Sequence, residues 1–267
     1  MINIVCALHC EAKALINHYR MSAVPGSLFP LFVNDELRLV VSGIGKVATS
    51  AAMTYVFSKM GESYNEPWIN SGIAGHEDAE IGAWYNVNKI TEQSTGFNWY
   101  PARTKLDGFE NSGLLTVDQP VSSYQSNVLY DMEASAFMAT ALKLSSVELV
   151  QVMKVVSDNR ENHHENIDKN RIVRLMDENI DPIISVIEYL KNKHLEYNAI
   201  YGVDGLYLSC LEKWRFSQYE RKQLERLIQR WRLLGQQDTL ASLDNSKNGK
   251  QVLTWFEAEI NHASLVY

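Results

Sequence analysis

The sequence predicts an α/β protein with a mostly parallel central sheet flanked by helices, followed by a helical C-terminal extension. Short apolar runs rich in β-branched residues, such as Ile2–Leu8 and Leu149–Val156, are typical of strands covered on both faces. These runs alternate with helical patterns, which favours parallel strands joined by helical crossovers. A long amphipathic pattern with a charged face then follows in residues 214–235.

The remaining elements follow in order along the chain. Further strands are expected at Leu37–Val41, Trp68–Ile69 and Trp84–Ile90, and helices at Lys46–Met60, Glu133–Leu144 and 167–193, the last interrupted at Pro182. Residues 91–113 are rich in Thr, Gly, Asn and aromatic residues and predict loops with one short strand. The strand that ends at Val156 is expected to lead into a polar loop that begins at Ser157.

Composition excludes several classes of protein. With 267 residues, of which 46% are hydrophobic and 21% charged, the chain can bury a large core. The formal net charge of −7 argues against nucleic-acid binding by the whole molecule. The three cysteines (Cys6, Cys10 and Cys210) predict buried thiols without a disulfide framework or a metal site. No stretch approaches the roughly 18 apolar residues of a membrane span, so we expect a soluble, cytoplasmic protein.

Four short blocks carry the functional signal: Ser42–Ala48, Asn70–Gly75, Asp131–Ala136 and Lys154–Asp158. The first two are glycine-rich turns at the ends of apolar runs, where the backbone can approach a ligand closely. The other two place acidic side chains, Glu133 and Asp158, in segments that otherwise have buried character. Because an unpaired buried carboxylate is costly, such residues usually have a partner or a chemical task.

Each acidic residue also has a purely structural interpretation. Glu11 can lie in the solvated first turn of a helix, where an acid favours the helix dipole. Glu133 can belong to a helix N-terminus that Asp131 caps, and Asp158 can cap a turn. The glycines Gly43 and Gly45 precede a helix whose free N–H groups can attract an anion or a sugar oxygen. Alternatively, the two glycines only form a tight turn from strand to helix.

Taken in this order, the blocks resemble the nucleoside phosphorylase and nucleosidase superfamily. The most similar branch is the 5'-methylthioadenosine/S-adenosylhomocysteine nucleosidases, which cleave the bond between ribose and purine with water. The resemblance covers roughly residues 1–190 and is poor between 91 and 130. It implies a purine nucleoside phosphorylase-like catalytic domain over 1–195, an extension over 196–267, a purine nucleoside substrate, no cofactor and a homodimer.

The resemblance also implies roles for the three acidic residues. Glu11 follows the first strand, as does the family's glutamate that activates water. Glu133 follows Met132, which matches the Met-Glu pair that holds the ribose hydroxyls. Asp158 matches the aspartate that protonates N7 of the purine, and Ser157 would orient it.

Five further residues match the substrate pocket of the family. Leu8 and Ile44 should line the apolar side of the ribose pocket. Lys154 occupies the position of an arginine that steadies the water, with the same charge but without the forked geometry. Gly72 belongs to the second glycine turn, and the next residue, Ile73, replaces a serine of the nucleosidases, which puts the orientation of substrate in question.

The acceptor of the ribosyl group follows from motifs that the chain lacks. Phosphorylases of the superfamily hold phosphate with a Gly-Asp-Pro-x-Arg turn after the first strand and with an arginine before the second glycine turn, and neither occurs here. We therefore expect hydrolysis, although Lys46 leaves phosphorolysis open. A third alternative is a nucleoside-binding scaffold in which Ile73 marks lost catalysis and the extension carries the function.

The extension contains a helix with clear end signals. Ser217 with Glu220 predicts a capping box, and Gly235 predicts the helix end. One face is apolar, and the rest carries Arg221, Lys222, Arg226, Arg230 and Arg232. This basic surface could dock a protein partner or a nucleic acid, but we expect a helix packed through its apolar face with a solvated basic face.

Overall fold

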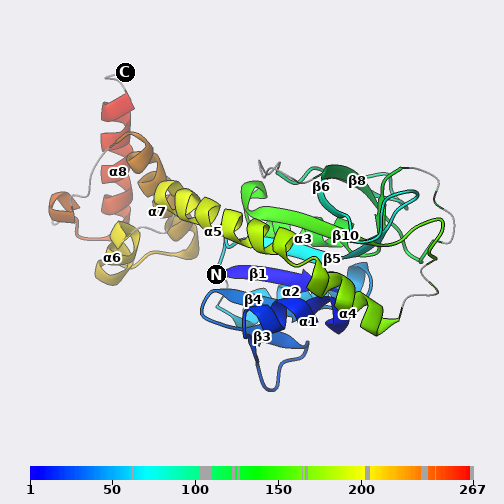
Figure 1. Cartoon of the computed structure of the whole chain (residues 1–267). Helices are drawn as coiled ribbons and strands as arrows, with labels where there is room; N and C mark the ends of the chain where they lie inside the picture. The colour runs from blue at the N-terminus through cyan, green and yellow to red at the C-terminus, as the bar shows by residue number, and fades with distance from the viewer. Residues whose placement is uncertain are drawn as a thin grey trace. The chain divides into compact units, whose positions relative to one another are not determined.

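The computed structural model describes residues 1–61, 63–102, 110–121, 124, 127–163, 165, 168–201, 205–235, 240–243 and 245–264. The chain forms two compact units, Met1–His194 and Leu195–Tyr267. Figure 1 shows all strands in the first unit and only helices and loops in the second.

Among the described residues, ten strands form the sheet at the centre of the first unit. Its strands are β1 (Ile2–Cys6), β2 (Ser22–Ala23), β3 (Leu31–Val33), β4 (Leu37–Val41), β5 (Trp68–Gly75), β6 (Trp84–Glu92), β7 (Asn98–Trp99), β8 (Glu110–Thr116), β9 (Leu129–Asp131) and β10 (Val150–Asp158). They pair in the order β10-β6-β8-β9-β5-β1-β4-β3-β2, and β7 pairs with β6. Since β10 also pairs with β5, the strands β10, β6, β8, β9 and β5 close into a ring.

The sheet is mixed, which corrects the expectation of a mostly parallel one. Five strand pairings are parallel and five are antiparallel in the part of the chain that the structure describes. A helix follows each of β1, β4, β9 and β10, whereas β2, β3 and β4, and then β5 to β9, follow one another without a helix among the described residues. No helix separates β6, β7, β8 and β9 among the described residues, so some of these strands pair without a helical crossover.

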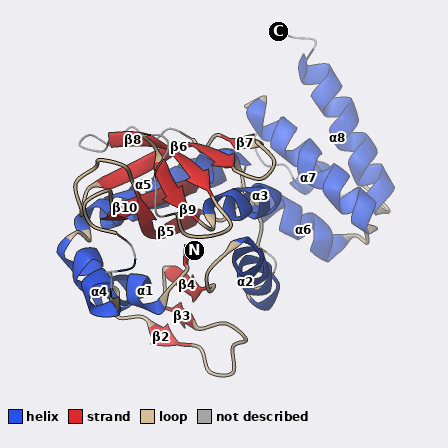
Figure 2. Cartoon of the chain, turned by 90° about the vertical axis from the view of Figure 1, so that its right-hand side faces the viewer, coloured by secondary structure: helices blue, strands red, loops and turns tan. Residues whose placement is uncertain are grey.

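Helices cover the sheet on two sides (Figure 2). The helices of the first unit are α1 (His9–His18), α2 (Lys46–Lys59), α3 (Ala134–Leu144), α4 (Lys169–Glu178) and α5 (Asp181–Tyr201), which continues into the second unit. One apolar core joins the sheet to α1, α4 and the first part of α5, and it includes Leu15, Met176 and Ile187. A second core joins the sheet to α2 and α3 and includes Met53 and Phe137.

The parallel strands position the candidate site. β4, β1, β5 and β10 lie side by side and run in the same direction, so their carboxyl ends meet at one edge of the sheet. β10 is longer than expected, since Ser157 and Asp158 belong to the strand and not to a polar loop. Pairing with β5 through Asp158 and Gly75 extends it, and all nine residues of β10 are buried.

The second unit has a core of its own. Its helices are α6 (Gly205–Lys213), α7 (Gln218–Leu233), a 3-10 turn (Leu240–Leu243) and α8 (Gly249–Ser264). The apolar face of α7 is buried, and Trp231 packs on Trp255 with ring centroids 5.3 Å apart. The capping box of Ser217 and Glu220 is confirmed, as is the helix end at Gly235, which has a φ of 70°. Among the described residues, we find no helix with the length and apolar character needed to span a membrane.

Candidate active site

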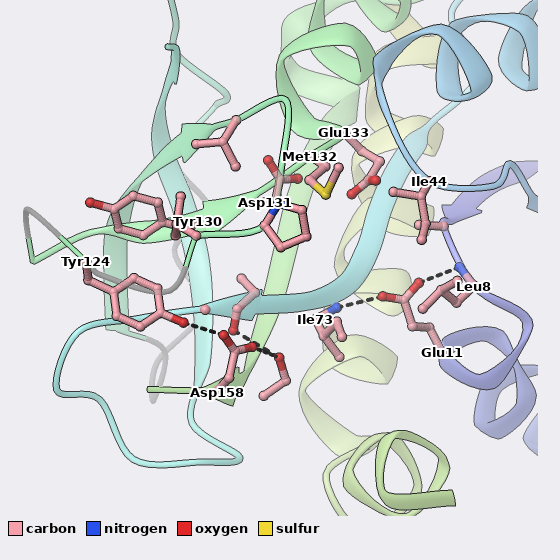
Figure 3. A pocket seen from close by; sticks show the side chains of 17 residues that line it. Leu8, Glu11, Ile44, Ile73, Tyr124, Tyr130, Asp131, Met132, Glu133 and Asp158 are labelled. Carbon is pink, nitrogen blue, oxygen red and sulfur yellow. Dashed lines mark hydrogen bonds between the residues drawn. The ribbon is translucent and has the colours of Figure 1, made fainter. Parts of the chain in front are cut away.

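A cavity of about 180 Å³ opens at the carboxyl ends of the parallel strands (Figure 3). Eight of the ten site residues predicted from the sequence line it: Leu8, Glu11, Ile44, Ile73, Met132, Glu133, Ser157 and Asp158. The two that do not line it are Gly72 and Lys154. The strand ends thus bring together residues that lie up to 150 positions apart in the chain.

Glu11 is held in place by two backbone N–H groups. Its Oε2 accepts a hydrogen bond from the Leu8 N–H at 2.8 Å, and its Oε1 accepts one from the Ile73 N–H at 3.0 Å. The bond to Leu8 closes the first turn of α1, so the helix-capping role and the site position coincide. Burial raises the pKa of Glu11, although the two N–H groups and the charge of Lys154 oppose the shift. A buried carboxylate with a raised pKa is suited to accept a proton from water.

The second glycine turn makes room for this carboxylate. A Cβ atom added at Gly72 would lie 2.9 Å from Glu11 Oε1, closer than side chains tolerate. Gly72 therefore supports the site by its lack of a side chain rather than by contact with the cavity. Ile73 lines the cavity with its side chain and holds Glu11 through its N–H, a bond that any residue except proline could supply.

Glu133 accepts a hydrogen bond from the backbone N–H of Gly45 at 2.7 Å. Gly45 precedes α2 with a φ of 96°, which favours glycine at this position. The helix N-terminus that was expected to attract an anion or a sugar oxygen therefore holds the Glu133 carboxylate. Burial, and then the negative charge of Asp131, raises the pKa of Glu133 to about 7.

Lys154 lies behind the cavity in a buried ion pair with Asp131. Its Nζ is 3.0 Å from Asp131 Oδ2, and Asp131 also accepts from the Thr116 hydroxyl and the Ala134 N–H. Burial alone would lower the pKa of Lys154, but the carboxylates of Asp131, Glu133 and Glu11 raise it above its ordinary value. Its ammonium therefore stays charged and offsets part of the negative charge around the cavity.

Asp158 is bound through both of its carboxylate oxygens. The Ser157 hydroxyl donates to Oδ1 at 2.5 Å, and the Tyr124 hydroxyl donates to Oδ2. The backbone carbonyl of Asp158 accepts from the N–H of His76, which follows Gly75 at the end of β5. Like Gly72, Gly75 has no room for a side chain, since an added Cβ would lie 2.7 Å from Asp158 Oδ2.

The sequence did not reveal every residue of the cavity. Tyr124 and Tyr130 line it, as do Val117, Pro120 and Val121, which lie between β8 and β9 or at their ends. This stretch matches the resembled family poorly and has no periodicity, so no pattern singled out Tyr124. Asp131 was expected only as a helix cap. It does bind the Ala134 N–H, but it also anchors Lys154.

The charge of the lining restricts its ligands. The side chains of Glu11, Asp131, Glu133 and Asp158 line the cavity, and no Arg or Lys does so among the described residues. In the same part of the chain, no group of three or more His, Cys, Asp or Glu side chains is arranged to hold a metal ion. Such a pocket favours a neutral or positively charged group over an anion.

No protein-family model matches the sequence, and no curated protein matches it either. Among solved structures, the fold is that of the 5'-methylthioadenosine/S-adenosylhomocysteine nucleosidases. The 5'-methylthioadenosine nucleosidase of Arabidopsis thaliana in its apo form superposes with a TM-score of 0.59 at 19% identity, over 71% of this chain and 95% of that one.

Two bacterial nucleosidases superpose in the same way. The enzyme of S. pneumoniae, solved with a transition-state inhibitor, gives a TM-score of 0.53 at 20% identity over 71% of this chain and 98% of that one. The enzyme of Campylobacter jejuni gives 0.54 at 16% identity over 71% and 96%. At these identities the likeness shows the fold. The matched share is close to that of the first unit, which holds 194 of the 267 residues.

Proposed function

We propose that the first unit hydrolyses the N-glycosidic bond of a purine-type nucleoside of the methylthioadenosine or S-adenosylhomocysteine kind. The observation that carries the proposal is the placement of Glu11 and Asp158 at one cavity, each fixed against the end of β5. Glu11 is bound at Ile73 (Figure 3). Asp158 Oδ2 lies beside Gly75, where an added Cβ atom would be 2.7 Å from it. The nucleosidase fold supports the same chemistry.

The two attachment points are separated along β5. Ile73 and Gly75 are two residues apart in a strand, which corresponds to about 7 Å along β5. Glycosidases that attack the sugar directly with water hold their two carboxyl groups roughly 6.5–9.5 Å apart, because a water molecule must fit between the carboxylate that activates it and the sugar. By this analogy, Glu11 would serve the water and Asp158 the leaving base.

The proposed reaction balances as follows. The Glu11 carboxylate takes a proton from water, and the water oxygen forms a bond to C1' of the ribose. The bond from C1' to N9 breaks, and its electron pair passes to the purine, which takes a proton at N7 from Asp158; Asp158 must enter this step as the protonated carboxyl and leaves it as the carboxylate. Glu133 accepts hydrogen bonds from the ribose hydroxyls, while Leu8 and Ile44 cover the apolar side of the sugar.

The electrostatics favour water over phosphate as the acceptor. A phosphate dianion bound in this cavity would face four acidic side chains without a lining cation. Lys46, which left phosphorolysis open, has its ammonium 2.5 Å from Glu92 and 2.6 Å from Asp118. Two carboxylates already neutralise it, so it would bind a further anion weakly.

The test is incubation of the protein with methylthioadenosine, adenosine and inosine, with and without phosphate. Release of free base without phosphate supports the hydrolase, whereas release that requires phosphate would indicate a phosphorylase. Binding without turnover would favour a nucleoside-binding scaffold. We expect Asp158→Asn to lower kcat by about 100-fold or more while the circular dichroism spectrum stays unchanged. An active Asn variant would remove Asp158 from the proposed role.

The cellular setting is part of the proposal. Cys6, Cys10 and Cys210 are free and buried, which suits a reducing cytoplasm. The homodimer and the protein partner of the second unit stay predictions. Size-exclusion chromatography with light scattering tests the first of them.

A further inference from the structure

The cavity is small for the ligand that the proposed function requires. Its volume is about 180 Å³, whereas pockets for small molecules usually begin at roughly 300 Å³. A purine with its ribose therefore needs one lining group to move aside. The group that moves must be one whose displacement costs little free energy.

Seven of the seventeen lining residues are fixed by the sheet. Ile73, Ala74 and Gly75 lie in β5, Tyr130 and Asp131 in β9, and Ser157 and Asp158 in β10, all hydrogen-bonded to neighbouring strands. Tyr124 lies instead in the connection between β8 and β9, outside regular secondary structure. Its side chain is held by the hydrogen bond to Asp158 and by the ring of Tyr130, whose centroid is 5.1 Å away.

The Tyr124 hydroxyl occupies the place that a purine nitrogen would need. Ser157 already takes Oδ1 of Asp158, so Oδ2 is the carboxylate oxygen left for the base, and Tyr124 donates its proton there. The phenol fits because Gly75 has no side chain, since a Cβ at that position would collide with the Tyr124 oxygen. Figure 3 shows the Tyr124 ring on the Asp158 side of the cavity, away from Glu11.

We propose that Tyr124 is a latch: its hydroxyl closes the base end of the cavity, and an incoming purine displaces this hydroxyl from Asp158. This inference rests on the proposed function. Because the latch must open before the base can bind, the apparent affinity for a purine is lowered by the fraction of molecules in the open state. Removing the hydroxyl should therefore strengthen binding, whereas removing a direct contact with the ligand would weaken it.

The experiment measures the dissociation constant of adenine by calorimetry for the full-length wild type and Tyr124→Phe. We expect adenine to bind the Phe variant about tenfold more tightly, which corresponds to about 1.4 kcal/mol. The matched control is Tyr219→Phe, the same chemical change at a tyrosine that is 78% exposed in the second unit. It should leave the constant unchanged. With methylthioadenosine as substrate, KM should fall in the Phe variant.

Equal or weaker binding of adenine to Tyr124→Phe would overturn the latch. The same holds for a crystal structure with adenine in the cavity and the bond between Tyr124 and Asp158 intact. In the Asp158→Asn background, Tyr124→Phe should have a smaller effect, because the amide is a weaker acceptor than the carboxylate. Hydrolysis of methylthioadenosine by the wild type separates the two proposals. If the wild type hydrolyses it but Tyr124→Phe binds adenine no more tightly, the latch alone is refuted. If Tyr124→Phe binds adenine more tightly but the wild type does not hydrolyse methylthioadenosine, the proposed function alone is refuted.

Discussion

The ionisation of Glu133 should make the stability of the first unit depend on pH, and Glu133→Gln should remove that dependence. Glu133 is 6% exposed, and burial together with the charge of Asp131 raises its pKa from an ordinary value of 4.5 to about 7. Glutamine has nearly the same shape and can still accept the hydrogen bond from the Gly45 N–H, but it carries no charge.

The size of this change in the free energy of unfolding follows from the difference between the pKa of Glu133 in the folded and in the unfolded chain. The pKa of Glu133 is about 7 in the folded protein and 4.5 for an unperturbed glutamate. At 1.36 kcal/mol per pKa unit, this difference amounts to about 3 kcal/mol. Since the folded protein holds this proton more tightly, it binds more protons than the unfolded chain between pH 4.5 and pH 7. The free energy of unfolding therefore falls as pH rises through this window and levels off above it.

The assay is urea unfolding followed by circular dichroism from pH 4 to pH 8 for the wild type and the Gln variant. Groups that do not interact with Glu133 titrate equally in both proteins, so the difference between the two curves reports Glu133 together with the charges coupled to it. We expect the wild type to lose about 3 kcal/mol more than the variant between pH 4.5 and pH 7.5. Parallel pH profiles for the two proteins would refute the argument that burial raises the pKa of this carboxyl.

Two further substitutions test the support of the site. Gly72→Ala would push the Glu11 carboxylate from its position, and we expect kcat/KM to fall by about 100-fold with little change in stability. Gly205→Ala, where the added methyl group meets open space, is the control, and equal activity of both variants would contradict the steric argument. Lys154→Met leaves Asp131 buried without its cation and should cost about 3–5 kcal/mol, measured as a lower urea midpoint. A midpoint within experimental error of the wild type would show that the pair does not stabilise the fold.

The sequence predicted the location of the site because strand ends obey a geometric rule. Parallel neighbours share the direction of their carboxyl ends, so blocks that follow separate parallel strands converge at one edge of the sheet. Glu11 after β1 and Asp158 at the end of β10 meet in this way, although 147 positions separate them. The glycine-rich turn before α2 could also be predicted from the sequence, and its residues Gly43 and Gly45 both adopt a positive φ.

Contacts that depend on strand register and on irregular connections could not be predicted. Lys154 reaches Asp131 because β10 and β9 both lie next to β5, and nothing in the local pattern of either residue shows this pairing. Tyr124 lies in a connection without periodicity, so its bond to Asp158 was missed. The mixed sheet was missed for a related reason, since strand direction between β6 and β9 depends on connections that are not helical.

The cost of gathering carboxylates in one cavity is itself an argument about function. Glu11 and Glu133 are stabilised by backbone N–H groups, Asp158 by hydroxyls and Asp131 by Lys154, so the fold supplies each acid with donors. Apart from Lys154, these donors are neutral, so the charges of those carboxylates that are ionised are only partly cancelled. A ribosyl group gains positive charge as its bond to the base breaks, and the field of these carboxylates favours that charge more than it favours the neutral nucleoside. The same field opposes phosphate at every stage, which is why we expect water to be the acceptor.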